Sequence, residues 1–280
     1  MGGIAVVTDS TAYLPPAVVA EHGIRVVPLQ VVIGGMPYDE DDVSPTTLAD
    51  ALRAWKPVTT SRPGPEVFAR TYLKAAEEGC AAVVSVHLSG QMSGTAESAQ
   101  VAAREAPIPV EVVDSRSLGM GMGFAVLTAV EKAATGAGVE EVAAAARRRA
   151  LGATVVFYVD TLEHLRRGGR IGAATALLGS ALAVKPLLAL VDGGISPLEK
   201  VRTSSRAIAR LEEVVVDRVG TGTALDVAVH HLANESRAEA VAARLQQRLA
   251  VRGEVMVSEV GAVVGAHVGP GMLAVVAAPI

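Results

Sequence analysis

The chain has 280 residues, half of them apolar, a net charge of -4 and few aromatic rings (three Phe, four Tyr and one Trp). This length and composition are sufficient for a sizeable core in two modest domains or one large one. The acidic balance and the scarcity of rings argue against nucleic acid as a partner, because nucleic-acid binding needs basic patches and stacking surfaces. The single cysteine, Cys80, excludes an intrachain disulfide and is typical of a reducing compartment.

Nothing in the hydropathy pattern predicts membrane insertion. The longest apolar stretch, residues 173–184, is too short to span a bilayer. The N-terminal residues lack the basic start and the cleavage site of a signal peptide. We therefore expect a cytoplasmic protein without stable membrane insertion.

The first half alternates short apolar runs with helical patterns, which is typical of a parallel sheet covered on both faces. Pro28 divides the β-rich run at 24–33, which favours two pieces or an edge strand. The remaining strands are predicted at residues 4–8, 81–86 and 110–114. Helices are predicted at residues 15–21, 45–55, 66–78, from 95 onward, 124–134 and 139–150.

The second half has a different pattern, with a hairpin among helices, and this favours a mixed sheet. Asp192-Gly193-Gly194 is a hairpin signal between strands at 186–191 and 195–202. Further strands are predicted at residues 153–159, 225–230, 254–260 and 272–277. Helices are predicted at residues 162–167, 173–184, 204–219 and 235–251, with Ser204 or Ser205 as the N-cap of the third. We place the domain boundary at residue 152, giving domains 1–151 and 152–280.

Several cofactor motifs are absent from the sequence. It contains no GxxxxGK[ST] phosphate loop, no HExxH and no CxxC, and its six histidines are scattered. The glycine-rich run at 119–124 fails the dinucleotide fingerprint, because Phe124 stands where the third glycine is needed. We expect no cofactor and no metal.

Four polar segments interrupt the apolar pattern. In chain order they carry Thr60 and Ser61, then Ser93 and Gly94, then Arg170 between glycines, then His267 in a glycine-rich turn. In the second, a buried strand feeds a Gly/Ser loop into a helix N-terminus, where free backbone N–H groups favour an anion. Each segment also has an ordinary role in capping or turning the chain. Together, hydroxyls, one arginine and one histidine suit a carboxylate better than a polyphosphate.

These segments resemble the DegV family over nearly the whole chain. The matching residues are 7–11 (VTDST), 60–63 (TSRP), 88–90 (LSG), 93–95 (SGT), 113–115 (VDS), 160–163 (DTLE), 168–171 (GGRI), 185–186 (KP), 192–193 (DG), 200–203 (KVRT) and 265–271 (GAHVGPG). Where relatives often carry Thr-Ser-Gln-Pro-Ser, this chain has Arg62 and Gly64, which affects the outer contacts of that loop.

The resemblance implies a two-domain α/β fold, with an N-terminal parallel-sheet domain of three layers and a smaller C-terminal α/β domain with a mixed sheet. It also implies a carrier similar to the fatty-acid-binding subunit of bacterial fatty acid kinase. Such a carrier buries a long acyl chain between its domains, while a separate kinase subunit related to dihydroxyacetone kinases phosphorylates the carboxylate. By motif, the head-group ligands are Ser61, Ser93 and His267, with Thr60 and Gly94 beside them. Arg170 supports them, and Arg202 lies on the surface that meets the kinase.

The acyl chain gives the carrier a simple physical basis, because each buried CH₂ contributes roughly 0.8 kcal/mol. The apolar segments 118–127 and 173–184 are candidate walls, although for any individual residue in them a place in the ordinary core is the favoured interpretation. Arg170 or a protonated His267 would neutralise the carboxylate. Basic residues close in sequence favour a positive face for an acidic partner: Arg166, Arg167, Arg170, Lys185, Lys200, Arg202, Arg206 and Arg210.

Two alternatives remain open at this point. The first is a serine hydrolase or acyltransferase in which Ser93 is the nucleophile, His267 the base and Asp9 or Asp114 the orienting acid. Its loop reads Gly90-Gln91-Met92-Ser93-Gly94 rather than GxSxG. The second is a carrier for another apolar carboxylate, with no kinase.

Overall fold

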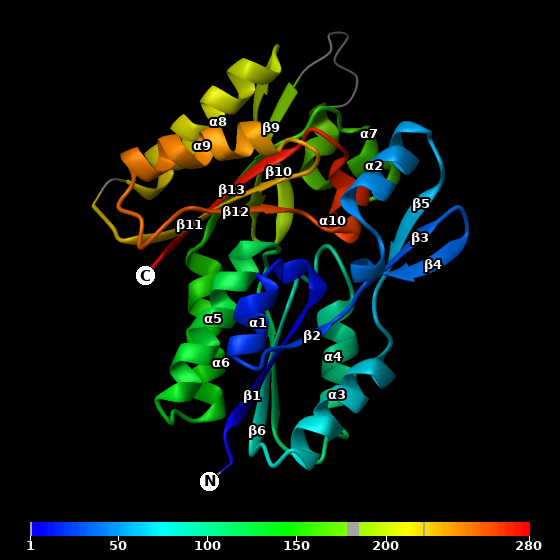
Figure 1. The fold of residues 1–280 in the computed structure, drawn as a ribbon, viewed down its shortest axis with the longest axis vertical. Helices are drawn as coiled ribbons and strands as arrows, with labels where there is room; N and C mark the ends of the chain where they lie inside the picture. Colours follow the sequence, from blue (N-terminus) through cyan, green and yellow to red (C-terminus); the bar gives the residue numbers. More distant parts are fainter. Residues whose placement is uncertain (1, 178–184, 221) are drawn as a thin grey trace. The chain divides into compact units, whose positions relative to one another are not determined.

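The computed structural model describes residues 2–177, 185–220 and 222–280. The chain forms two compact units (Figure 1). Unit 1 comprises Met1–Gln30 and Ser61–Gly152, and unit 2 comprises Val31–Thr60 and Ala153–Ile280. The sequence prediction has a single boundary at residue 152, whereas the chain also changes unit after Gln30 and after Thr60.

Unit 1 contains the expected parallel sheet. Its strands, in spatial order, are β2 (Arg25–Val27), β1 (Ile4–Asp9), β6 (Ala82–His87) and β7 (Val110–Asp114). Pro28 separates β2 from β3 (Gln30–Ile33), which joins another sheet, so the predicted break is confirmed. All six residues of β6 are buried, as expected for a central strand covered on both faces.

Helices cover both faces of this sheet (Figure 1). One layer is formed by α5 (Met120–Ala134) and α6 (Val139–Gly152), and the other by α3 (Pro65–Glu77) and α4 (Thr95–Ala103). Phe68, Tyr72 and Val83 lie at the centre of the core below α3 and α4. A short 3-10 helix, η1 (Ser10–Ala12), and α1 (Pro16–Glu21) connect β1 to β2.

The strand order reverses direction between β1 and β6. The chain runs from β1 to β2 on one side of β1, and then returns to place β6 on the other side. In open parallel sheets, ligands bind outside the carboxyl ends of the strands at such a switch point. This brings the loop after Asp9 and the loop after His87, which contains Ser93, to the same edge of unit 1.

Unit 2 contains the predicted mixed sheet. Its strands, in spatial order, are β10 (Gly194–Val201), β9 (Lys185–Val191), β8 (Thr154–Tyr158), β13 (Leu273–Pro279), β11 (Leu225–His231) and β12 (Met256–Glu259). Among the described strands of this sheet, β11 and β12 pair in parallel and the other neighbours pair antiparallel. The predicted hairpin is confirmed: Asp192 and Gly193 have φ of 50° and 85°, the positive values that a type I′ turn requires.

Two long helices, α8 (Ser204–Val219) and α9 (Glu235–Arg248), pack on this sheet (Figure 1). Their apolar faces share one core with the strands, centred on Leu211, Val241 and Val275. The predicted N-cap of α8 is wrong. Thr203 caps the helix by accepting from the Arg206 amide, because Ser204 is already helical and bonds Tyr158.

Shorter elements complete unit 2. They are η2 (Glu40–Asp42), α2 (Pro45–Arg53), α7 (Glu163–Arg167), η3 (Gly172–Leu177) and α10 (Ala262–Val268). The helix predicted at 173–184 begins as the 3-10 helix η3, and residues 178–184 lie outside the described residues. Within the described ranges, no helix is both long and apolar enough to cross a membrane.

A small sheet of β4 (Met36–Asp39), β3 and β5 (Val58–Ser61) was only partly predicted. No strand is predicted from the sequence at β4 or β5. Every residue of β4 is exposed, so the burial signal that marks a strand is missing there. The hydroxyl-rich segment with Thr60 and Ser61 lies in β5, so it is a strand rather than a loop.

Candidate ligand-binding site

His267 lies in the last turn of helix α10, not in the glycine-rich turn expected from the sequence. The turn itself starts at Gly269, which has a φ of 75°. Gly265 is helical, and a Cβ there would lie 2.4 Å from Leu48 Cδ2. Close packing, rather than a turn, therefore accounts for this glycine.

Residues 31–60 hold α10 at three points along its length. The buried Glu40 carboxylate accepts from the Val263 amide at 2.9 Å and so caps the helix N-terminus. Leu48 packs on Gly265 in the middle of the helix. Thr60 Oγ1 lies 2.9 Å from His267 Nε2 at its end. These contacts explain why residues 31–60 belong to unit 2.

The segment after α7 forms the other side of the His267 environment. A Cβ on Gly168 would lie 2.0 Å from His267 Nδ1, so only glycine leaves room for the imidazole. Arg170 Nη1 donates to the Gly168 carbonyl at 2.7 Å, and Arg170 is exposed. Thr60, Arg170 and His267 are therefore brought together within unit 2.

Burial lowers the pKa of His267 to about 4, and the nearby positive charge of Arg170 acts in the same direction. The imidazole is consequently neutral at physiological pH. Of the two candidate cations for a bound carboxylate, Arg170 is the one that remains charged. His267 Nδ1 is buried and has no hydrogen-bond partner among the described residues.

The pKa of His267 predicts a loss of stability in mild acid. In the unfolded chain a histidine binds its proton near pH 6.5, whereas folded His267 binds it only near pH 4. Its stabilising contribution is thus complete above pH 6.5 and is lost as the pH falls from 6.5 towards 4. Between pH 7 and 4.5, His267→Gln should lose about 2 kcal/mol less unfolding free energy than the wild type. Equal losses in urea titrations at the two pH values would contradict the prediction.

The backbone amides of the loop that carries Ser93 are already hydrogen-bonded within the protein. The amides of residues 89–93 all donate within the protein, to Ser117 O, Asp114 Oδ1 and Ser89. The amides of residues 89–93 are therefore not free, because the loop folds back on Ser89; the prediction of free N–H groups concerns the start of α4, which these bonds do not involve. Ser93 Oγ pairs with Thr95 Oγ1 at 2.8 Å, at the start of α4.

Ser61 and Arg62 enter unit 1 directly after Thr60. Ser61 is exposed, and its hydroxyl makes only a long contact of 3.4 Å with Gln30 Oε1. Arg62 donates to the Gly94 carbonyl at 3.1 Å and to Glu97 Oε2 at 2.7 Å. A Cβ on Gly94 would lie 1.8 Å from Arg62 Nη1. Arg62 thus ties the segment of Ser61 to that of Ser93 and Gly94.

A fully buried polar chain lies under the strand ends of unit 1. The Asp9 carboxylate accepts from Thr11 N, Thr11 Oγ1, Leu88 N and His87 Nδ1, at 2.5 to 3.1 Å. Ser85 Oγ lies 2.7 Å from His87 Nε2 and accepts from Tyr72 OH at 2.9 Å. Burial raises the pKa of Tyr72 to about 12. The sequence predicts a role for Asp9 only in the alternative hydrolase triad, so this network was not predicted.

Most of the basic residues expected to form one positive face are already paired. Arg166 and Arg167 bind Glu163 and hold the pKa of that carboxyl at about 2. Lys185 binds Asp160, and Arg210 binds Glu199 and Glu213. Of the eight basic residues named from the sequence, Lys200, Arg202 and Arg206 have no acidic or hydrogen-bonding partner within the described ranges, and all three are exposed near the start of α8.

Sequence relatives match this chain over almost its whole length. A DegV domain-containing protein of Streptomyces coelicolor is 57% identical over 274 residues, covering 98% of this chain and 97% of that protein. A DegV domain-containing protein of Mycobacterium tuberculosis is 38% identical over 273 residues, covering 97% and 96%.

Solved structures have the same fold. A fatty-acid-binding DegV family protein of Thermus thermophilus has a TM-score of 0.93 and 35% identity, covering 99% of this chain and 100% of that one. DegV of Bacillus subtilis, described as a fatty acid binding protein, has a TM-score of 0.90 and 33% identity, with both chains fully covered. The predicted two-domain α/β fold is confirmed by these likenesses. The model of the DegV family of uncharacterised proteins matches residues 3–279, and the chain belongs to that family.

Proposed function

We propose that this protein is a non-catalytic carrier that binds a long-chain fatty acid and presents its carboxylate to a separate ATP-dependent kinase subunit. The product would be an acyl phosphate used in phospholipid synthesis in the cytoplasm. The fatty-acid-binding descriptions of the Thermus thermophilus and Bacillus subtilis relatives support the choice of ligand. The kinase partner is a further part of the proposal and rests on the resemblance to the fatty-acid-binding subunit of bacterial fatty acid kinase.

The observation that carries the proposal is the environment of His267. Its Nε2 is paired with Thr60, while the buried Nδ1 has no partner among the described residues. An unpaired buried polar atom costs about 1–3 kcal/mol. In the tautomer with the proton on Nδ1, Thr60 donates to Nε2, and a bound carboxylate would accept from Nδ1 and remove that cost. With the imidazole neutral, Arg170 supplies the positive charge that a carboxylate needs.

The proposed ligands in unit 1 are hydroxyl and helix-end groups. Ser93 Oγ and Thr95 Oγ1 adjoin the first turn of α4, whose early amides lack intrahelical acceptors, as in any helix. The backbone of Gly94 belongs to the same turn, and the Ser61 hydroxyl is exposed with one weak contact. A carboxylate bound by such donors needs neither a metal nor a second full charge.

The contacts of Ser93 and His267 favour a carrier over a hydrolase. Within unit 1, Ser93 Oγ is already paired with Thr95, and within unit 2, His267 Nε2 is already paired with Thr60. A serine nucleophile activated by a histidine would need both of these groups for a serine–histidine hydrogen bond. Asp9, His87 and Ser85 do follow the order of a triad, but all three side chains are fully buried. Ser85 therefore has no access to substrate.

Arg202 is the proposed contact with the kinase. Together with Lys200 and Arg206 it leaves positive charge uncompensated at one end of α8. Surfaces of this kind steer an oppositely charged partner and set its orientation.

Two substitutions distinguish fatty-acid binding from presentation of the bound carboxylate to the kinase. Ser93→Ala should weaken fatty-acid binding about tenfold in a fluorescent fatty-acid displacement assay, because a hydrogen bond to a charged head group contributes about 1.5 kcal/mol or more. Arg202→Ala should keep that affinity and lose most acyl phosphate formation when a cognate kinase and ATP are supplied. Mass spectrometry of small molecules released on denaturation identifies the lipid.

Ser236→Ala provides the matched control, because Ser236 is exposed on α9 and belongs to neither proposed ligand set. Unchanged binding by Ser93→Ala would contradict the head-group assignment. Full acyl phosphate formation by Arg202→Ala would contradict the partner surface. Release of a different apolar carboxylate, with no kinase activity on it, would favour the carrier without a kinase.

A further inference from the structure

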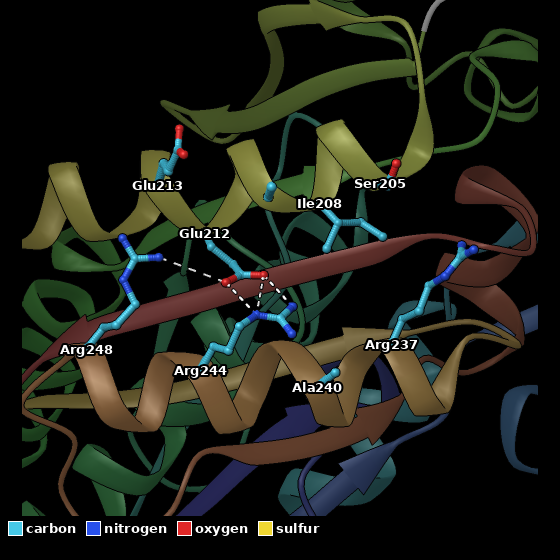
Figure 2. Close-up of a pocket in the computed structure, with 9 residues that line it drawn as sticks. Ser205, Ile208, Glu212, Glu213, Arg237, Ala240, Arg244 and Arg248 are labelled. Atoms are coloured by element: carbon cyan, nitrogen blue, oxygen red, sulfur yellow. Dashed lines mark hydrogen bonds and ion pairs between the residues drawn. The ribbon is translucent and has the colours of Figure 1, made fainter.

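A groove with a volume of about 500 Å³ runs between α8 and α9 (Figure 2). It contains none of the proposed head-group ligands. From α8 it is lined by Ser205, Ile208, Ala209, Glu212 and Glu213, and from α9 by Arg237, Ala240, Arg244 and Arg248. These residues recur every three or four positions, so each set forms one stripe along its helix.

The acidic charge in the groove is already neutralised. Glu212 is 4% exposed and accepts three hydrogen bonds from Arg244, at 2.6 to 3.1 Å (Figure 2). Glu213 is bound by Arg210 at 2.8 Å. Arg244 is consequently fixed by its own protein and has little capacity for a partner.

Positive charge remains at the two ends of the α9 stripe. Arg248 has only a long contact of 3.9 Å with Glu212. Arg237 makes no hydrogen bond or ion pair with the described part of the chain, and Figure 2 shows it apart from Glu212 and Glu213. Its charge is near enough to Asp160 to help lower the pKa of that carboxyl, which Lys185 already binds. The two arginines are eleven positions apart, which is about 16 Å along a helix. The small side chains of Ala209 and Ala240 lie between the helices.

We propose that this groove binds an acidic amphipathic helix of a partner protein. The charge pattern specifies the occupant: two carboxylates about 16 Å apart on one face, with small apolar residues between them. On an α-helix, residues eleven positions apart lie on the same face after three turns, so one helix meets both arginines. The inference goes beyond fatty-acid carriage and does not depend on it.

The test uses an alanine-based helical peptide with Glu at positions 3 and 14, labelled for fluorescence anisotropy with the full-length protein. It should bind at low salt and weaken as salt screens the charges. A peptide with Glu at positions 3 and 12, which lie on opposite faces, should bind at least tenfold more weakly. Arg237→Glu and Arg248→Glu should each weaken binding about tenfold, and the double variant should instead prefer the peptide with Lys at both positions.

Arg218→Glu is the matched control, because Arg218 is exposed in the last turn of α8 and does not line the groove. Its peptide binding should equal that of the wild type, as should that of Ser93→Ala, which tests the lipid site separately. The proposal would be overturned if the two peptides with different glutamate spacing bound equally well. It would also be overturned if the Arg237→Glu, Arg248→Glu double variant bound the first peptide as tightly as the wild type. Self-association of the protein that is abolished by Arg248→Glu would also overturn it, because the occupant would then be a second copy.

Discussion

Asp9→Asn should destabilise unit 1 by about 3 kcal/mol, more than any other isosteric change we consider. The carboxylate accepts four hydrogen bonds and is fully buried. An asparagine in its place turns one acceptor into an NH₂ group that faces donors, so at least two buried partners lose their bonds. Each orphaned donor costs about 1–3 kcal/mol. Hydrogen exchange of the β1 and β6 amides measures this loss of stability in unit 1 itself.

Asp114→Asn is the control for this prediction. Asp114 also accepts two backbone amides, from Gly90 and Arg116, but it is only partly buried. Water can therefore replace its lost bonds, and we expect a cost of about 1 kcal/mol or less. Similar protection losses in the two variants would show that the buried network does not hold the ends of β1 and β6 together.

Much of the fold was predictable because its signals are local. The apolar runs of β1, β6 and β7 and the prolines that open α1, α2 and α3 act within a few residues. The excursion of residues 31–60 into unit 2 is different. It depends on Glu40, Leu48 and Thr60, each of which contacts a residue of α10 more than two hundred positions away. No periodicity in either segment encodes that pairing.

The candidate site could be proposed from the sequence as a set of residue types but not as a geometry. The motif grouped Thr60 with His267, and the two side chains lie 2.9 Å apart in the structure. It could not show that burial keeps His267 neutral, because burial depends on α10, α7 and residues 31–60 together. The Asp9 network was not predicted for a related reason. Tyr72 in α3 and Ser85 in β6 fit the pattern of ordinary core residues, and the sequence does not show that their hydroxyls meet.

Gly168→Ala should reduce fatty-acid affinity at least tenfold while leaving the backbone unstrained. Gly168 has a φ of -73° and a ψ of -9°, which alanine adopts readily. Its Cβ would nevertheless lie 2.0 Å from His267 Nδ1, so the imidazole must move and give up its bond to Thr60. The loss of one head-group donor corresponds to about 1.4 kcal/mol. Displacement of a fluorescent fatty acid measures it.

Gly169→Ala gives the matched comparison at the next residue. Its φ of 70° makes alanine cost about 1–2 kcal/mol of stability, but a Cβ there meets no atom within 4 Å. Gly169→Ala should therefore bind fatty acid as tightly as the wild type although the protein is less stable. For Gly168→Ala we expect weaker fatty-acid binding without backbone strain. Adding His267→Ala to Gly168→Ala should relieve the collision and recover stability without restoring affinity. If Gly168→Ala bound fatty acid as tightly as the wild type, His267 would not be a head-group ligand, since that substitution cannot leave its imidazole in place.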